Sequence, residues 1–323
     1  MYYLNSKNVE AIPRDWYELA AVIKKAITCM GNHEFSQPIK PFLRYRDLEN
    51  RIIAMPAFIG GDFNLSGIKW IASFPKNIDR NIMVAHSVSI LNDADTGAPF
   101  CTINTSLIST IRTVSVSALM IEKNLRDKED QHQFIVGICG FGPVGQMHVE
   151  MIADLLDDKL AELRIFDIRP VNLSLIPAAI RDKVVLTDSY ENAFAGADIF
   201  IAATMSEEPY IVLDPHPGSL HLNISLRDYQ AEFMNNVDIM IVDDWKEVCR
   251  ENTDIERMYL HEGLREDDTF NLVDLFAGDR EVSFGPSDVV MFNPMGMAIF
   301  DIAIGYHFFR KATERKIGIQ LED

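Results

Sequence analysis

The chain has 323 residues, 48% of them hydrophobic and 24% charged, and a formal net charge of −18 at pH 7. This length and composition are typical of a folded protein with two domains of ordinary size. The excess of negative charge argues against binding to nucleic acids or anionic membranes, because sequence-independent attraction to phosphate groups needs positive charge.

The sequence carries no signal that would direct it to a membrane or bind a metal. No apolar run reaches the roughly 18 residues needed to cross a bilayer. The first residues lack a basic stretch followed by an apolar core, so we expect a cytoplasmic protein. The four cysteines and eight histidines are scattered without the spacing of metal ligands. We therefore expect no metal and no disulfide framework.

The first 125 residues combine helices with short strands. Residues 15–30 have apolar side chains at helical spacing and predict the first helix. Runs of β type follow, with turns at residues 60–61 and 93–99 between them: residues 51–55, 67–73 and 87–92. Residues 106–123 again show helical spacing. The polar, charged segment 126–132 then predicts a solvated linker.

A glycine-rich turn follows this linker and is the most informative motif of the chain. The apolar run 134–139 leads into Gly140, Gly142 and Gly145, which fit Gly-x-Gly-x-x-Gly, and residues 146–156 have helical spacing. This strand–turn–helix context is typical of a dinucleotide site. The first glycine permits the tight turn, the second lets the backbone approach a pyrophosphate, and the third lets the helix pack against the strand. The alternative is a tight turn without a ligand.

Two residues after the second predicted strand bear on the choice of cofactor. Asp167 follows Gly145 by 22 residues and would accept hydrogen bonds from a ribose diol. That position favours NAD over NADP, because a carboxylate repels the 2′-phosphate, although Arg169 weakens this preference. The predicted cofactor-binding residues of this region are Gly140, Gly142, Pro143, Val144, Gly145, Asp167 and Arg169.

From residue 134 on, short apolar strands alternate regularly with helical segments. The predicted strands are residues 134–139, 163–166, 184–186, 199–203, 220–224, 239–242 and 289–292. Such alternation predicts a parallel sheet covered by helices on both faces. Residues 255–286 are acidic and have no clear periodicity, whereas residues 297–315 predict a helix that returns to the first domain.

The predicted fold class is therefore α/β, a Rossmann-type doubly wound parallel sheet with a second, α+β domain. We expect the Rossmann domain to span residues 126–296 and to bind NAD. Residues 1–125, completed by residues 297–323, form the second domain in this prediction.

Three cations in apolar surroundings are candidates for binding an anionic ligand. Lys69 lies in the middle of a strand pattern, and Arg112 lies in a helix of small and apolar residues. A buried arginine needs an anionic partner, either a protein carboxylate or a bound carboxylate or phosphate. Lys69 has the alternative of a surface lysine on an edge strand. Lys40 follows a rigid turn. Together these cations suggest a substrate that carries carboxylates.

Polar residues at the ends of two neighbouring strands are candidates for the chemistry. Asp228 follows the strand 220–224, and ligands of open α/β sheets bind beyond the carboxyl ends of the strands. Asp228 is therefore a candidate general base, with an ordinary turn or cap aspartate as the alternative. Ser225 and Thr204 end neighbouring strands and could contact the nicotinamide ribose or cap the strand ends.

These residues together resemble the ornithine cyclodeaminase/mu-crystallin family. The matching stretches span nearly the whole chain: residues 37–40, 54–56, 67–69, 90–93, 112–113, the glycine turn, 223–228 and 293–301. Within the family, the sequence looks most like the 2,3-diaminopropionate biosynthesis dehydrogenases of siderophore and antibiotic pathways. The resemblance implies an N-terminal domain for substrate binding and dimerisation, so a homodimer is expected.

The resemblance also implies roles for individual residues. Lys69 and Arg112 would bind the substrate carboxylate, with Lys69 also counted as catalytic and Arg112 also near the cofactor, and Met55 would line the substrate site. Asp228 would handle the proton of the attacking water. This chain has Lys40 where family members usually have an arginine, which keeps the charge but loses the bidentate fork.

The implied reaction is the NAD-dependent oxidation of N-(2-amino-2-carboxyethyl)-L-glutamate, followed by hydrolysis to L-2,3-diaminopropionate and 2-oxoglutarate. Cyclodeaminases of the family carry a glutamate where this chain has Ile53, which counts against ornithine as the substrate. The alternatives are an ornithine cyclodeaminase, a ketimine or imino-acid reductase, an alanine dehydrogenase, and a non-catalytic, crystallin-like NAD-binding protein.

Overall fold

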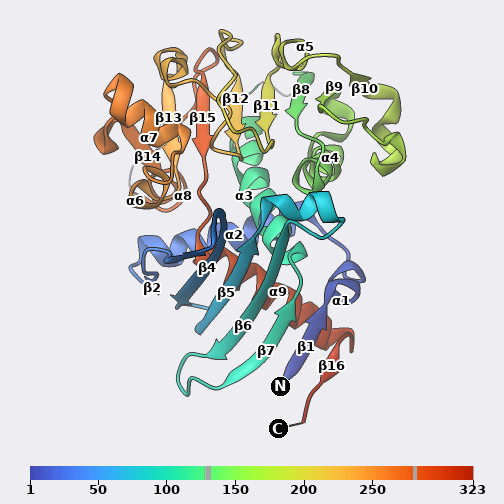
Figure 1. Ribbon diagram of the computed structural model, residues 1–323, viewed down its shortest axis with the longest axis vertical. Coiled ribbons are helices and arrows are strands. Elements are labelled where there is room, and N and C mark those ends of the chain that lie inside the picture. Colours follow the sequence, from blue (N-terminus) through green and yellow to red (C-terminus); the bar gives the residue numbers. More distant parts are fainter. Residues whose placement is uncertain (127, 129–131, 279–281, 323) are drawn as a thin grey trace. The chain divides into compact units, whose positions relative to one another are not determined.

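A computed structural model describes residues 1–126, 128, 132–278 and 282–322 of the chain. The residues group into two compact units: Met1–Arg112 with Gly296–Asp323 (unit 1), and Thr113–Met295 (unit 2). Both units are drawn in Figure 1. Among the helices described, none is long and apolar enough to cross a membrane.

Unit 1 is a mixed, mainly antiparallel sheet with helices packed on it. The strand order is β16-β1-β7-β6-β5-β4-β2, and β3 pairs with β4. Its elements are β1 (Tyr2–Asn5), α1 (Ser6–Glu10), α2 (Trp16–Gly31), β2 (Phe35–Ser36), β3 (Phe42–Tyr45), β4 (Asp47–Ile59), β5 (Leu65–Ser73), β6 (Ala85–Asp93), β7 (Pro99–Asn104), α9 (Ala298–Glu314) and β16 (Ile319–Gln320).

One face of this sheet is covered by α9, which packs against β4, β5 and β6 (Figure 1). Side chains alternate between the two faces of a strand. On β4, the side chains of Met55, Ala57 and Ile59 are therefore on one face, and all three are buried. The helix α9 is itself buried along most of its length. The predicted return of the C-terminal helix to the first domain is thus a feature of unit 1.

Unit 2 is built on a second sheet in which all strand pairs are parallel. The strand order is β10-β9-β8-β11-β12-β15-β13-β14. Its elements are α3 (Leu107–Arg126, which starts in unit 1), β8 (Phe134–Cys139), α4 (Pro143–Leu156), β9 (Leu160–Phe166), β10 (Val184–Leu186), α5 (Tyr190–Phe194), β11 (Ile199–Ala202), β12 (Leu220–Asn223), β13 (Ile239–Val242), α6 (Trp245–Val248), α7 (Asp254–Arg257), β14 (Thr269–Asn271), α8 (Leu272–Phe276) and β15 (Val290–Asn293).

The central strands of unit 2 are buried on both faces. Every residue of β11, β12, β13 and β15 is buried, and consecutive side chains of a strand point to opposite faces. Both faces of the sheet are therefore covered, as in doubly wound α/β folds. The predicted parallel sheet and the predicted fold class are confirmed.

The boundary between the units differs from the predicted one. The units divide at Arg112 and Thr113, within α3, rather than at residue 125. The later part of α3 groups with unit 2, where Ser117 Oγ lies 2.9 Å from Nε2 of His148 on α4. Of the predicted linker 126–132, residues 127 and 129–131 lie outside the described residues.

Candidate active site

The glycine turn of unit 2 joins β8 to α4 and depends on its glycines for two different reasons. Gly140 has φ +95°, a backbone conformation that disfavours side chains, and its N–H donates to Phe166 O of β9. A Cβ on Gly145 would lie 1.9 Å from Gly140 O. In contrast, a Cβ on Gly142 would meet no atom within 4 Å. Gly142 therefore keeps open space at the start of α4, as close approach of a pyrophosphate requires.

We expect alanine substitutions at Gly142 and Gly145 to separate an effect on cofactor binding from an effect on folding. Gly145→Ala forces a backbone clash and should lower the free energy of unfolding by about 1–3 kcal/mol. Gly142→Ala meets no protein atom and has an ordinary φ of −71°, so its melting temperature should match that of the wild type. Its affinity for NADH should nevertheless fall at least about tenfold, as fluorescence titration can measure. Undiminished NADH affinity in folded Gly142→Ala would contradict the assignment.

Asp167 directly follows β9 and links the glycine turn to the end of this strand. Its Oδ2 accepts a hydrogen bond from Phe141 N at 2.7 Å, and its Oδ1 accepts one from Arg169 N at 2.8 Å. Arg169 Nε lies 3.5 Å from the same Oδ1, on a largely exposed side chain. The carboxylate thus already orders the turn, and its contact with a ribose diol stays a prediction.

A buried carboxylate with two hydroxyl partners lies beyond the ends of β11 and β12. Asp228 has no exposed surface. Its Oδ1 accepts from Thr204 Oγ1 and its Oδ2 from Ser225 Oγ, each at 2.5 Å. Its backbone carbonyl accepts from Tyr210 N and Ile211 N, each at 2.8 Å. The structure therefore brings together the three residues that the sequence placed at neighbouring strand ends.

The surroundings of Asp228 favour proton exchange. Burial raises the pKa of the Asp228 carboxyl above its usual range, although hydrogen bonds from Ser225 and Thr204 and the charge of Arg227 act in the opposite direction. A raised pKa brings a carboxyl group closer to the pH at which a general base works best. Asp228 is thus suited both to accept and to release a proton.

A cluster of buried cations lies in unit 1, on the sheet face that α9 covers. Lys69 of β5 pairs in register with Met55 of β4 and with Ser89 of β6. Only 2% of Lys69 is exposed. Its Nζ lies 2.8 Å from Oδ2 of Asp301 on α9 and donates to Ser109 Oγ at 3.1 Å. The alternative of a surface lysine is wrong.

The two other candidate cations belong to the same cluster. Arg112 Nε donates to Asp301 Oδ1 at 3.2 Å. Lys40 is buried and its Nζ donates to Gly296 O at 2.8 Å. The Arg112 guanidinium lies against this glycine, because a Cβ on Gly296 would be only 2.6 Å from Arg112 Nη1. Lys40, Lys69 and Arg112 therefore converge, and Asp301 is the protein carboxylate that Lys69 and Arg112 share.

The surroundings of Lys69 lower the pKa of its ammonium group. Burial lowers the pKa of Lys69 to about 8, and the positive charges of Arg112 and Lys40 contribute in the same direction. Asp301 partly offsets this decrease. Lys69 is therefore protonated at neutral pH but close to the range in which it loses its charge.

Residues 5–316 of the chain match the model of the ornithine cyclodeaminase/mu-crystallin family. The chain belongs to this family. The predicted family membership is confirmed. Asn223 and Asn293, from two of the stretches that carried the resemblance, are in contact in unit 2, with Asn223 Nδ2 2.9 Å from Asn293 Oδ1.

Individual relatives match over nearly the full length of this family member. It is 32% identical to the N-((2S)-2-amino-2-carboxyethyl)-L-glutamate dehydrogenase of Staphylococcus aureus, over 99% of the chain and 98% of that protein. It is 20% identical to the alanine dehydrogenase of Archaeoglobus fulgidus, over 94% and 93%. Among solved structures, the Thermococcus litoralis Delta(1)-pyrroline-2-carboxylate reductase in complex with NADH and L-proline has a TM-score of 0.87 at 20% identity, covering 99% and 100%. An archaeal alanine dehydrogenase dimer with bound NAD has a TM-score of 0.83 at 17% identity, covering 100% and 99%.

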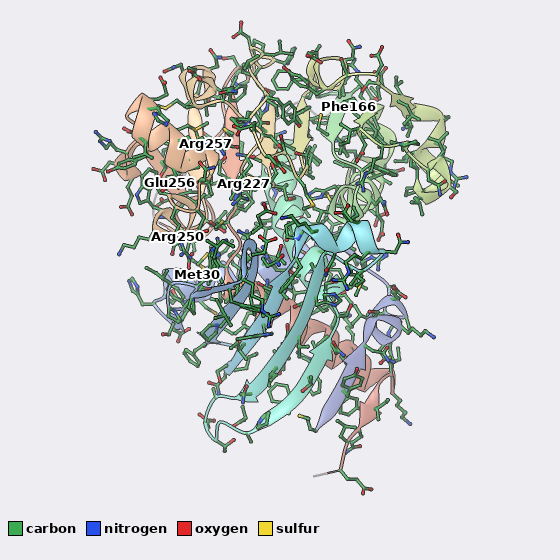
Figure 2. The ribbon with its side chains drawn as sticks, in the orientation of Figure 1. Met30, Phe166, Arg227, Arg250, Glu256 and Arg257 are labelled. Atoms are coloured by element: carbon green, nitrogen blue, oxygen red, sulfur yellow. The ribbon has the colours of Figure 1, made fainter. Side chains whose placement is uncertain are left out.

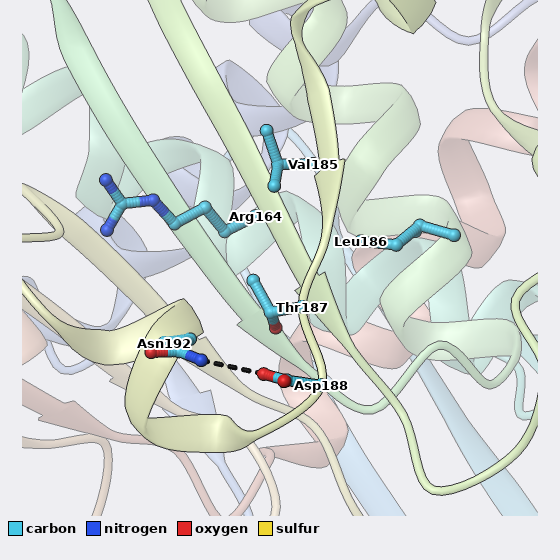
Figure 3. A pocket seen from close by; sticks show the side chains of 6 residues that line it. All are labelled: Arg164, Val185, Leu186, Thr187, Asp188 and Asn192. Atoms are coloured by element: carbon cyan, nitrogen blue, oxygen red, sulfur yellow. Dashed lines mark hydrogen bonds between the residues drawn. The ribbon is translucent and has the colours of Figure 1, made fainter.

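One surface hollow of unit 2 contains none of the predicted site residues. It lies at the sheet edge formed by β10 (Figure 3) and is lined by Arg164, Val185, Leu186, Thr187, Asp188 and Asn192. Asn192 Nδ2 donates to Asp188 Oδ1 at 2.7 Å, shown as the dashed line. Because the hollow lies at the edge strand rather than beside the glycine turn or Asp228, we assign it no role.

The buried carboxylates Asp301 and Asp254 were not among the predicted site residues. Asp301 lies in the apolar run of α9 and therefore carries the same signal as Lys69 and Arg112, a charge in an apolar segment. Asp254 begins α7, next to the segment 255–286 for which the sequence predicted no structure. Nothing local distinguishes Asp254 from an ordinary helix-start aspartate.

Proposed function

We propose that this protein oxidises N-(2-amino-2-carboxyethyl)-L-glutamate with NAD+ and hydrolyses the product to L-2,3-diaminopropionate and 2-oxoglutarate, for siderophore or antibiotic biosynthesis. The observation that carries the proposal is the convergence of Lys40, Lys69 and Arg112 in the buried cluster of unit 1. Such cations suit a substrate with three carboxylates. The 32% identity to a dehydrogenase named for this compound supports the same substrate.

The coarser class of the enzyme is established. Several relatives and structural neighbours are dehydrogenases or reductases of amino-acid-derived substrates, and three of these neighbours are complexes with NAD or NADH. The chain is accordingly an NAD-dependent oxidoreductase that acts on CH–NH bonds. The glycine turn fits this cofactor, because the open space at Gly142 and the N-terminus of α4 suit a pyrophosphate.

Bound at the glycine turn, NAD+ would supply the hydride acceptor for the glutamyl α-carbon, which would leave a protonated C=N bond in the substrate. Lys69, Arg112 and Lys40 hold the substrate carboxylates and so fix the position of that carbon. Asp228 takes a proton from the water that adds to the same carbon. The nitrogen then takes up a proton and the C–N bond breaks, so that 2,3-diaminopropionate leaves. The hydroxyl on the oxidised carbon loses its proton and becomes the keto group of 2-oxoglutarate.

The residue at the position where cyclodeaminases of the family carry a glutamate favours this substrate over ornithine. Ile53 of β4 lies two positions from Met55 and therefore on the same face of the strand. An isoleucine offers no hydrogen-bond acceptor for an ammonium group.

We also propose that the enzyme is a homodimer formed through the other face of the unit 1 sheet. On β5 that face carries Ile68 and Trp70, and Trp70 is 45% exposed. Within the described residues of unit 1, α9 packs on the opposite face. An exposed apolar sheet face of this kind suits a second copy, and one structural neighbour is a dimer.

We expect purified enzyme, NAD+ and N-(2-amino-2-carboxyethyl)-L-glutamate to give NADH, 2-oxoglutarate and 2,3-diaminopropionate in equal amounts. NADH absorbance and chromatography of the two products measure this stoichiometry. A parallel reaction with L-ornithine should give neither proline nor ammonia. Conversion of ornithine without net NADH, together with no reaction of the proposed substrate, would identify a cyclodeaminase instead.

A further inference from the structure

A second buried carboxylate of unit 2 holds the backbone that carries Asp228. Asp254 begins α7 and has no exposed surface. Its Oδ2 accepts hydrogen bonds from Asn223 Nδ2 at 2.9 Å, from Asp228 N at 3.1 Å and from Tyr229 N at 3.2 Å. One oxygen atom thus connects the end of β12 with the two residues that include Asp228.

The loop between β12 and Asp228 depends on these bonds for its shape. Leu226 has φ +59°, a left-handed conformation that is unusual for a leucine. Its N–H donates to Asn223 Oδ1 at 3.1 Å, and its carbonyl accepts from Asp254 N at 2.8 Å. Asp254 therefore bonds to the loop through its backbone as well as through its side chain.

The side chain next to Asp228 is anchored independently of Asp254. The Tyr229 ring is buried, and its hydroxyl lies 3.0 Å from His221 Nδ1. His221 Nε2 in turn lies 2.9 Å from Ser219 Oγ. Because these hydrogen bonds through His221 hold the Tyr229 side chain, the core around it should stay in place when Asp254 is lost. Loss of Asp254 would then release only the N–H groups of Asp228 and Tyr229.

Charge explains why this position has a carboxylate rather than an amide. Arg257 Nη1 lies 3.5 Å from Asp254 Oδ1, so one oxygen faces a cation while the other accepts three N–H groups. Figure 2 labels Arg257 and Glu256 on α7 and Arg227 on the neighbouring loop. An asparagine must direct its NH2 group toward either the guanidinium or the three donors, and neither can accept its protons.

We infer that Asp254 is a positioning residue that fixes the direction of the Asp228 carboxylate toward Thr204 and Ser225. This inference rests on the proposed role of Asp228. It assigns a function to α7, in a part of the chain where the sequence predicted none.

The pKa of the Asp254 carboxyl group means that the inference predicts a measurable pH dependence. Burial raises the pKa of Asp254 to about 6, with a further increase from the charge of Asp228. The hydrogen bonds from Asn223 and Tyr229 and the charge of Arg257 lower it. Protonation below pH 6 removes the negative charge that the N–H groups of Asp228 and Tyr229 share, so their hydrogen bonds to Asp254 should weaken there.

The kinetic test compares Asp254→Asn with Glu256→Gln, a half-buried neighbour on the same helix that accepts from Asn252 N. We expect Asp254→Asn to lower kcat about 10- to 100-fold, with KM and the Kd for NADH within about threefold of the wild-type values. The acidic limb of its kcat profile should move to lower pH, because removing the charge of Asp254 lowers the pKa of Asp228. Glu256→Gln should behave as the wild type. Unchanged kcat and an unmoved limb would overturn the inference, as would a loss of activity that only follows a loss of folded, NADH-binding protein.

Hydrogen exchange of the wild-type enzyme tests the same inference without turnover. The protection factors of the Asp228 and Tyr229 amides, corrected for intrinsic exchange, should fall between pH 7 and pH 5, whereas that of the Leu222 amide in β12 should not. Equal pH dependence at all three amides would overturn the inference. This measurement needs neither substrate nor a stable variant, so its outcome is independent of whether the proposed reaction is correct.

Discussion

Replacing Asp228 by asparagine is expected to lower kcat for the proposed substrate by about 100- to 10,000-fold, the usual contribution of a general acid–base group. The amide keeps the shape of the side chain but cannot take a proton from water. Thr204 and Ser225 donate to different oxygens of Asp228. In the variant one hydroxyl can still donate to the amide oxygen, and the other can rotate to accept from the amide NH2 group, so the fold should persist. Steady-state kinetics measure kcat, and calorimetric titration measures the binding of NADH. The Kd for NADH should stay within about threefold of the wild-type value.

Asp188→Asn is the matched control for this variant. Asp188 follows β10 just as Asp228 follows β12, but it is exposed and contacts Asn192. The substitution Asp188→Asn should leave kcat unchanged. A wild-type kcat in Asp228→Asn, or a loss of activity explained by weaker NADH binding alone, would contradict the proposed role of Asp228.

The second large effect is expected for Lys69→Met. Methionine fills much of the same volume but removes the charge that we propose holds a substrate carboxylate. Loss of one buried, charged partner typically costs about 2–5 kcal/mol, so kcat/KM should fall by about 30- to 5,000-fold, mainly through KM. Lys76→Met serves as the control, because the ion pairs of Lys76 with Asp47 and Glu49 are exposed. Equal kcat/KM in Lys69→Met and the wild type would exclude Lys69 from substrate binding.

The pKa of Lys69 gives the same site a predictable pH dependence. The free enzyme binds a carboxylate best with Lys69 protonated, so kcat/KM should fall as the pH rises through about 8. Asp301→Asn removes the carboxylate that raises this pKa, and the alkaline limb should therefore move to lower pH. If the alkaline limb of kcat/KM in Asp301→Asn lies at the same pH as in the wild type, Lys69 is not the group that titrates.

The fold was largely predictable because the buried strands of unit 2 are continuous apolar runs in the sequence. Continuous apolar runs such as residues 134–139 and 239–242 became β8 and β13 with the predicted ends. The strands β1 and β7 of unit 1 were missed, since they mix buried and partly exposed residues over a few positions. Residues 255–286 contain only short elements, and residues 279–281 of that segment lie outside the described residues.

The candidate site was predictable where a charge interrupts an apolar pattern. Lys69 and Arg112 stand out for that reason, and the structure places both against Asp301. Asp254 did not stand out, because its importance depends on a loop that is distant in sequence. Pairing between distant segments is a property of the tertiary structure, and no local periodicity encodes it.

The source of the hydride tests the central claim most directly. The substrate is prepared with deuterium at the glutamyl α-carbon and incubated with the enzyme and unlabelled NAD+. We predict one deuterium per turnover in the reduced cofactor by mass spectrometry, together with 2-oxoglutarate that carries no deuterium. Deuterium that is retained in an organic product or lost to water, with no label in the reduced cofactor, would contradict the account.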